Sequence, residues 1–255
     1  MAESKYKCLY KYLDFNGGLM MLKHHNLQFT NATKFNDLFD CHPALFNYSN
    51  VPEDQKRWPG AGFVSMKESL DMENLRNSIW ICCMSKVYDS LLMWAYYNNH
   101  KGICIGLNLD AVIQSCQNRF YGLMYPSAKE VQYKDILPKP DYFHDHPSWI
   151  DLLTTKAKAW EHEQEVRIIT KEPAWVNSGQ SIPSEFDDDE YVDFKEIRYY
   201  PELAPECFES VFLGVNMLPK KKTTIINAAT ALNPEVKIYQ MEIDTDAFKL
   251  RTELI

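Results

Sequence analysis

Three charged residues at alternate positions, Glu163, Glu165 and Arg167, are the strongest candidates for chemistry in this chain. In a β-strand, alternation with a period of two would point all three side chains to one face and Val166 and Ile168 to the other. Two carboxylates about 7 Å apart along a strand could stabilise a developing positive charge and orient a nucleophile. The alternative is a solvated edge strand that carries an ordinary Glu-Arg pair.

The elements around these residues favour a positioned site. Ser148 and Asp151 form a capping-box pattern, which predicts a helix with Leu153, Ala157 and Trp160 on one face. That helix leads directly into the charged stretch, which we expect to be a half-buried strand.

Polar residues near the N-terminus are further candidates for ligand binding. The segment 8–12 reads as a strand on which Tyr10 and Lys11 are neighbours, and the Lys11 ammonium could contact a phosphate or extend along an apolar surface to solvent. Asn36 and Asp37 follow a turn-rich segment and could hydrogen-bond to ribose or amide groups, although such pairs are also common in turns and helix caps.

Aromatic residues dominate the short helix predicted for residues 90–97. Trp94 and Tyr97 could stack on a planar ligand, or they could belong to the core.

Composition indicates a folded protein. Of the 255 residues, 45% are hydrophobic and 13% aromatic, which argues against disorder. The net charge of −8 disfavours broad, nonspecific binding of nucleic acid.

The seven cysteines show no C-x-x-C spacing and read as reduced thiols. The chain has neither a signal-peptide core nor an apolar run of membrane-spanning length, so we expect a cytoplasmic protein without membrane contact.

The order of the predicted elements indicates one α+β domain over residues 1–255, because no repeat or flexible linker divides the chain. Further strands are expected at 27–30, 79–84, 103–107, 196–199, 211–214 and 236–241. Helices are expected at 19–25 after a Gly-Gly turn, at 67–76 and from Pro219. Two excursions interrupt this pattern, a lid-like segment at 47–66 and an acidic loop at 171–190.

Several enzyme classes lack their signatures. No P-loop, dinucleotide-binding glycine motif or G-x-S-x-G is present. His144 and His146 lie in a Pro-flanked segment that favours a surface loop, so we expect no metal site. A magnesium-dependent nuclease is a further alternative, but Arg167 stands where a lysine would be expected, and arginine does not readily release a proton.

An ordered set of motifs resembles a bacterial family known as domain of unknown function twenty-nine seventy-one. The motifs are L-Y-K-Y at 9–12, F-N-D at 35–37, M-W-A-Y-Y at 93–97, H-K-G-I-C-I-G at 100–106, W-E-H-E-Q-E-V-R-I-I at 160–169 and L-G at 213–214. The family's usual F-N-D-P-F-E reads Phe-Asn-Asp-Leu-Phe-Asp here.

More remotely, the same plan resembles ADP-ribosyltransferase toxins. That resemblance implies a split, mainly antiparallel sheet flanked by helices, with NAD bound as substrate in the cleft. It assigns Glu165 to the nicotinamide-ribose hydroxyl and to stabilisation of the oxocarbenium ion, with Glu163 activating the acceptor and Arg167 beside them. Trp94 or Tyr97 would stack on nicotinamide, and Tyr10, Lys11, Asn36 and Asp37 would hold ribose or phosphate.

The implied protein is the toxin or effector of an anti-phage or toxin-antitoxin system. It would transfer ADP-ribose to a nucleic acid or protein and could be neutralised by an antitoxin or inhibitor protein. The alternative from another class is a non-catalytic binding or assembly module of a bacterial defence system, with the charged strand as its interface.

Overall fold

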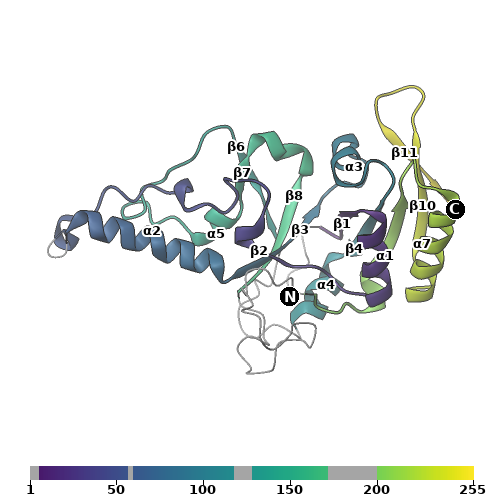
Figure 1. Ribbon diagram of the computed structural model, residues 1–255, viewed down its shortest axis with the longest axis horizontal. Helices are drawn as coiled ribbons and strands as arrows, with labels where there is room; N and C mark the ends of the chain where they lie inside the picture. Colours follow the sequence, from purple (N-terminus) through teal and green to yellow (C-terminus); the bar gives the residue numbers. More distant parts are fainter. Residues whose placement is uncertain (1–5, 57–59, 118–127, 172–199) are drawn as a thin grey trace, which may run out of the picture.

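A nine-stranded sheet organises the residues that the computed structural model describes, which are 6–56, 60–117, 128–171 and 200–255 (Figure 1). The strand order is β11-β10-β9-β4-β1-β3-β8-β5, and β2 also pairs with β3. All neighbours are antiparallel except β9 and β10. The predicted class, a single α+β domain with a mainly antiparallel sheet flanked by helices, is therefore confirmed.

The element bounds are as follows. The strands are β1 (Cys8–Leu13), β2 (Thr30–Asn31), β3 (Ile79–Ser85), β4 (Ile103–Asn108), β5 (Lys129–Glu130), β8 (Glu165–Lys171), β9 (Phe208–Leu213), β10 (Lys237–Ile243) and β11 (Leu250–Leu254), with a separate pair β6 (Gln132–Lys134) and β7 (Thr155–Ala157). The α-helices are α1 (Phe15–His24), α2 (Ala61–Asn77), α3 (Leu91–Asn98), α4 (Leu109–Gln117), α5 (Trp149–Leu153) and α7 (Pro219–Leu232). The short 3-10 helices are η1 (Ala32–Lys34), η2 (Pro43–Leu45), η3 (Glu53–Gln55), η4 (Lys158–Glu163) and η6 (Pro205–Cys207).

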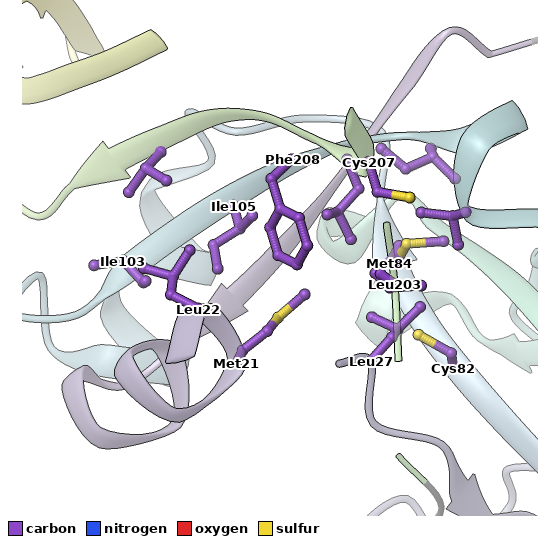
Figure 2. Close-up of a cluster of buried hydrophobic side chains, with 14 of the residues drawn as sticks. Met21, Leu22, Leu27, Cys82, Met84, Ile103, Ile105, Leu203, Cys207 and Phe208 are labelled. Atoms are coloured by element: carbon purple, nitrogen blue, oxygen red, sulfur yellow. The ribbon is translucent and has the colours of Figure 1, made fainter. Parts of the chain in front are cut away.

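Helices α1, α4 and α7 cover one face of the sheet. Figure 2 shows Met21 and Leu22 of α1 near Ile103 and Ile105 of β4 and Phe208 of β9. All five side chains are buried, and such burial contributes about 25 cal/mol per Å² of apolar surface.

The start of α1 differs from the expected turn at the Gly-Gly pair. The helix is capped by Asp14, whose side chain accepts a hydrogen bond from Gly17 N at 2.6 Å, so both glycines lie inside the first turn. A Cβ on Gly18 would lie 2.3 Å from Cδ1 of Ile103. Glycine is therefore required for the close approach of α1 to β4.

Helix α3 covers part of the opposite face. Its N-cap is Ser90, and Trp94 is fully buried beside Tyr12 of β1, with the two rings edge to face at 5.5 Å. The Trp94 indole donates a hydrogen bond to the Tyr88 carbonyl at 2.8 Å. Trp94 is therefore a core residue.

Strand β8 shows the predicted alternation but is buried on both faces. Val166 and Ile168 join the cluster under α1, whereas Glu165 and Arg167 point to the opposite face and are 3% and 0% exposed. The expectation of a half-buried strand is wrong because α5 and the segment 32–48 pack over the charged face, with Leu152, Leu153 and Ile169 in one cluster.

The segment before β8 is not the single helix that the sequence predicts. The capping box of Ser148 and Asp151 is present, but α5 ends at Leu153. Residues 155–157 instead pair in parallel with β6, and strand pairing here overrides helix propensity. Glu163 is the last residue of η4, and Gln164 adopts a left-handed conformation with φ of 44°. Glu163 is therefore not on the strand.

The two predicted excursions have different outcomes. In the segment 47–66, residues 61–66 form the first turns of α2, which projects from one end of the molecule (Figure 1). Apart from Lys171 in β8, the acidic loop at 171–190 lies outside the described residues, as does the strand expected at 196–199.

Helix α7 begins at Pro219 as predicted, and strands β3, β4, β9 and β10 lie within a few residues of their predicted positions. Helix α4 and strands β5, β6 and β11 were not predicted. In the described parts of the chain, no helix combines the length and the apolar character needed to span a membrane.

Candidate functional site

The sheet is split between β1 and β3. These strands are bridged at Tyr10 and Ser85, whereas β1 follows β4 through six residue pairs and β3 follows β8 through seven. Further along the same edge of β3, its partner is β2, at Trp80 and Ile81. The edge of β3 between these contacts therefore faces a gap.

Lys11 bridges this gap. Its ammonium group donates a hydrogen bond to the Cys83 carbonyl at 2.7 Å, where an unbroken sheet would place a backbone N–H of β1. This contact fixes the lysine at the split and leaves its positive charge at the cleft wall. The sequence-based alternatives were a phosphate contact or a path to solvent, and the observed partner is a backbone carbonyl.

A cleft of about 400 Å³ opens at the split. Six of the nine residues predicted as site residues line it: Tyr10, Lys11, Asn36, Tyr97, Glu163 and Glu165. They come from β1, the turn after η1, α3, η4 and the start of β8. The cleft therefore collects chemistry-bearing side chains that are up to 155 residues apart in sequence, from Tyr10 to Glu165.

Arg167 lies beneath the cleft and is held at every donor. Its guanidinium binds Asp40 through both Nη atoms at 2.8 and 2.7 Å, and Glu165 through Nε at 2.7 Å and Nη2 at 3.1 Å. Nη1 also donates to the Leu153 carbonyl at 2.6 Å. All five N–H groups of the guanidinium thus have partners, which is the arrangement that a fully buried arginine requires.

Lys156 joins the two glutamates from the other side. Its ammonium lies 2.5 Å from Oε2 of Glu163 and 3.1 Å from Oε2 of Glu165. It also lies 3.7 Å from Oδ2 of Asp40 and 5.1 Å from the centre of the Trp160 ring. Lys156 is 7% exposed, so its charge is compensated by carboxylates rather than by water.

Tyr97 completes the site at its open side. The phenol donates a hydrogen bond to Oε1 of Glu163 at 2.8 Å, and the residue is 47% exposed. Tyr133, on β6, accepts a hydrogen bond from the Glu165 backbone N at 2.8 Å and so helps to fix the start of β8. The two glutamates thus share Lys156, and each also has partners of its own: Tyr97 for Glu163, and Arg167 and Tyr133 for Glu165.

The buried charges shift one another's pKa values. Burial alone would raise the pKa of Glu165, but the neighbouring Arg167 and Lys156 outweigh it and hold this pKa well below its usual range. Burial alone would lower the pKa of Lys156, but Glu165, Glu163 and Asp40 outweigh it and raise this pKa. At neutral pH both groups are therefore ionised.

The cluster as a whole carries excess negative charge. Asp40, Glu163 and Glu165 contribute three carboxylates, and Lys156 and Arg167 contribute two cations, which leaves a formal charge of −1 beside the cleft. A carboxylate fixed in this way can stabilise positive charge that develops on a bound molecule, while Lys11 and Lys34 add two positive charges to the lining of the cleft.

Three predicted site residues do not line the cleft. Trp94 lies in the core, and Arg167 lies behind Glu165. Asp37 is used locally, because its Oδ1 accepts a hydrogen bond from Phe39 N at 3.0 Å. Arg167 contacts Glu165 as a buried partner and does not face the cleft.

Two residues of the cluster, Asp40 and Lys156, were missed by sequence reasoning. Asp40 is the last residue of Phe-Asn-Asp-Leu-Phe-Asp and lies three residues after Asp37, the acidic residue of the same segment that was predicted instead. Lys156 lies nine residues before Glu165 with no periodic relation to it, so only the pairing of β7 with β6 explains its position.

The hydrogen bonds of the carboxylates disfavour the alternative of a magnesium-dependent nuclease. A magnesium-dependent nuclease needs carboxylate oxygens that can bind the cation. Here both oxygens of Asp40 and of Glu165 already accept hydrogen bonds from Arg167. Within residues 6–56, 60–117, 128–171 and 200–255, no group of His, Cys, Asp or Glu side chains is placed to hold a metal ion.

The fold and the site together define an α+β protein with a split-sheet cleft above a buried cluster of charges. Residues 93–168 match the model of a family described as protein of unknown function (DUF2971). The matched segment contains Tyr97, Lys156, Glu163, Glu165 and Arg167, whereas Lys11, Asn36 and Asp40 lie outside it. Neither a curated protein nor a solved structure matches the chain.

Proposed function

We propose that the protein is an NAD-dependent ADP-ribosyltransferase that acts on a macromolecule. The observation that carries this proposal is the fixed carboxylate of Glu165 in a cleft at the split between β1 and β3. The same cleft is lined by a half-exposed tyrosine, a lysine and an asparagine, which suit a nicotinamide ring, a phosphate and a ribose.

The chemistry requires stabilisation of a cation. The glycosidic C–N bond of NAD breaks, and nicotinamide leaves with the bonding electron pair. The ribose C1 then carries oxocarbenium character, which the anionic cluster around Glu165 would stabilise. A nucleophilic atom of the acceptor forms the new bond to C1 and gives up its proton to Glu163.

The two glutamates suit different roles. Glu165 accepts three hydrogen bonds from Arg167 and Lys156, whereas Glu163 accepts one from Lys156 and one from Tyr97. A carboxylate has about four acceptor positions, so Glu163 retains more capacity for a proton or hydroxyl. Glu165 is the better fixed anion.

The remaining assignments follow from position. Tyr97 would stack on nicotinamide, while Tyr10, Lys11 and Asn36 would hold ribose or phosphate. Trp94 is buried in the core and therefore cannot stack on nicotinamide. Arg167 becomes a positioning residue because all its donors are engaged with Glu165, Asp40 and the Leu153 carbonyl. Asp37 has no assigned contact with NAD because it lies outside the cleft lining.

Labelled NAD tests the proposal directly. Purified protein incubated with labelled NAD and cell lysate should transfer label to a macromolecule. Glu165→Gln should reduce the rate by about 10²–10³, the effect of removing one preorganised electrostatic group. Glu53→Gln, on the exposed helix η3, is the matched control and should leave the rate unchanged.

Two outcomes would overturn the assignment. Folded wild-type protein that neither binds NAD in calorimetry nor transfers label would remove the enzyme hypothesis. Unchanged labelling by folded Glu165→Gln would remove the catalytic role of that carboxylate. Circular dichroism and thermal unfolding of each variant separate loss of chemistry from loss of fold.

The biological setting is also a proposal. We place the protein in the bacterial cytoplasm as the toxin or effector of an anti-phage or toxin-antitoxin system, neutralised by an antitoxin or inhibitor protein. Expression of the wild type should then slow bacterial growth, and expression of Glu165→Gln should not. Equal growth with both forms would contradict the toxin hypothesis.

A non-catalytic assembly module is the second candidate. The observation that favours it is an apolar stripe on α2, where Phe63, Met66 and Leu70 are 50%, 54% and 52% exposed. This spacing places the three side chains on one side of the helix. If NAD is neither bound nor consumed, and replacing these three residues by serine changes the oligomeric state in light scattering, the assembly hypothesis replaces the enzymatic one.

A further inference from the structure

A second hollow lies on the same face of the sheet as the cleft. Its volume is about 800 Å³, and Tyr10 lines both hollows. The strand registers pair Tyr10 with Ser85 at the split and with Gly106 on β4, and Gly106 in turn with Ser210 on β9. Paired residues share a face, so the groove extends from the cleft across β1 and β9 to β10.

The floor of this groove is built from small and aromatic side chains. A Cβ on Gly106 would lie 2.2 Å from Ser210 Oγ and 3.1 Å from a ring carbon of Tyr10, so glycine allows both to lie close to the sheet. Beside them, Phe212 stacks between Tyr88 and Tyr239, with ring centres at 4.4 and 5.0 Å.

Three tyrosines of the groove are partly exposed and carry stacking surfaces. Tyr10 meets Tyr88 edge to face at 5.3 Å, and Tyr239 closes the stack on β10. Tyrosine rings have electron-rich faces that attract cations, an interaction of about 0.5–1 kcal/mol at exposed sites. The aromatic floor therefore suits cationic or planar side chains.

Carboxylates outnumber ammonium groups along the walls. Glu206, Glu209 and Glu235 line the groove, against Lys7 and Lys237. Glu206 and Glu235 are exposed at its rim, as are Lys7 and Lys237. Glu209 is half buried and accepts a hydrogen bond from Asn108 at 2.8 Å. The lining as a whole has one more carboxylate than ammonium groups, and this excess together with the tyrosine floor favours positive charge.

We infer that this groove binds a basic segment of the acceptor protein and leads it to the cleft. The part of this inference that concerns catalysis rests on the proposed function. Tyr10 lines both hollows, so the end of the groove lies beside the proposed site of ADP-ribose transfer. It narrows the macromolecular acceptor to a protein, whose cationic side chains would contact the three glutamates and the tyrosine faces.

Charge argues against nucleic acid as the occupant. A phosphate backbone would meet three carboxylates and two lysines in the groove of a chain with a net charge of −8. Proteins that bind nucleic acid neutralise phosphates with lysine and arginine, and the opposite balance holds here. A basic peptide meets a complementary potential along the same path.

Fluorescence anisotropy on the full chain tests the groove without any need for catalysis. The probes are a labelled peptide of alternating arginine and serine, its glutamate-serine counterpart and a labelled single-stranded oligonucleotide. The variant Glu206→Gln/Glu235→Gln removes two exposed rim charges, and Glu53→Gln/Asp54→Asn removes two exposed charges from η3 as the matched control. Tyr239→Ala tests the aromatic floor separately.

The arginine-serine peptide should bind, and the rim variant should weaken it about tenfold, while the control changes nothing. Tyr239→Ala should also weaken it. Preferred binding of the oligonucleotide or the acidic peptide, or equal losses in the rim variant and its control, would overturn the inference.

Calorimetry with NAD on the same variants keeps the two proposals distinguishable. NAD binding should be equal in the rim variant and the wild type, because Glu206 and Glu235 do not line the cleft. Absence of NAD binding together with specific peptide binding would reject the proposed enzyme and retain the peptide groove. NAD-dependent labelling with no selective peptide binding would retain the enzyme and reject the groove.

Discussion

The two halves of the split sheet differ in what they bury on the same face: one buries apolar side chains and the other buries charged side chains. On one side of the split, β1, β4 and β9 bury Tyr12, Cys104 and Phe212 against α3. On the other side, β3 and β8 bury Glu165 and Arg167 with their ionic partners. The first half gains stability from apolar burial, whereas removing each ion of the second from water costs several kcal/mol before pairing offsets it.

This difference indicates where function is located. A charged cluster is often no more stabilising than well-packed apolar residues of similar volume, so stability alone does not explain its presence. The cleft of about 400 Å³ opens onto the charged half at Glu163 and Glu165. Each of the following predictions tests whether the charged half is the fragile and functional one.

The largest effect on stability is expected from Arg167→Ala. This change leaves Asp40 and Glu165 buried without their guanidinium partner and opens a cavity beneath the cleft. We expect the free energy of unfolding to fall by about 3–5 kcal/mol, measured by urea denaturation.

The matched control is Arg251→Ala. Arg251 pairs with Glu242 at 2.7 Å on β10 and β11, but its side chain is 61% exposed. An exposed pair contributes about 0–1 kcal/mol. Equal losses in the two variants would contradict the contrast between the halves.

The stability of the charged half should depend on pH. The folded-state pKa of Glu165 is depressed by Arg167 and Lys156, so its stabilising contribution is present above the unfolded-state pKa of the carboxyl. That contribution is lost as pH falls below about 4. From pH 7 to pH 3, the wild type should lose at least about 1.4 kcal/mol more unfolding free energy than Glu165→Gln.

Urea denaturation of both proteins at each pH gives the comparison. Lys156 shows the opposite pH dependence because its folded-state pKa is raised. Its contribution to stability is present below the unfolded-state pKa of about 10.5 and is lost as pH rises above that value. Identical pH dependence of wild type and Glu165→Gln in acid would show that Glu165 does not supply the linkage.

The apolar half should tolerate a conservative change well. Phe212→Leu keeps an apolar side chain between Tyr88 and Tyr239 and loses mainly the ring stacking at 4.4 and 5.0 Å. We expect a loss of about 1 kcal/mol in urea denaturation, within the range for conservative core changes. A loss as large as that of Arg167→Ala would erase the distinction between the two halves.

Local sequence patterns anticipated much of the frame of this site. Alternation in 165–168 correctly predicted a strand with the charged groups on one face, and Ser148 and Pro219 marked the starts of α5 and α7. These features depend on residues that are close in the sequence, so they can be predicted from periodicity and capping rules.

Long-range contacts were beyond such rules. Asp40 meets Arg167 across 127 positions, and Lys156 reaches the glutamates only because 155–157 pairs with β6 instead of continuing α5. The burial of β8 likewise depends on coverage by α5 and the segment 32–48. Sequence could name six residues that line the cleft, but it could not identify the two missing members of the charge cluster.

The smallest effect on stability is expected from Tyr97→Phe, which tests the boundary between the charged cluster and solvent. The change removes the hydroxyl that donates to Glu163 at 2.8 Å and keeps the ring. Because Tyr97 is 47% exposed, water can replace the lost donor, and the unfolding free energy should fall by only about 0.5 kcal/mol.

Enzyme kinetics should report the role of the Tyr97 ring separately. If Tyr97 stacks on nicotinamide, Tyr97→Phe should leave KM for NAD nearly unchanged in the labelling assay, whereas Tyr97→Ala should raise it at least about fivefold, the equivalent of about 1 kcal/mol of stacking. Equal KM values for the two variants would place the nicotinamide elsewhere and leave Tyr97 as a hydrogen-bond partner of Glu163 alone.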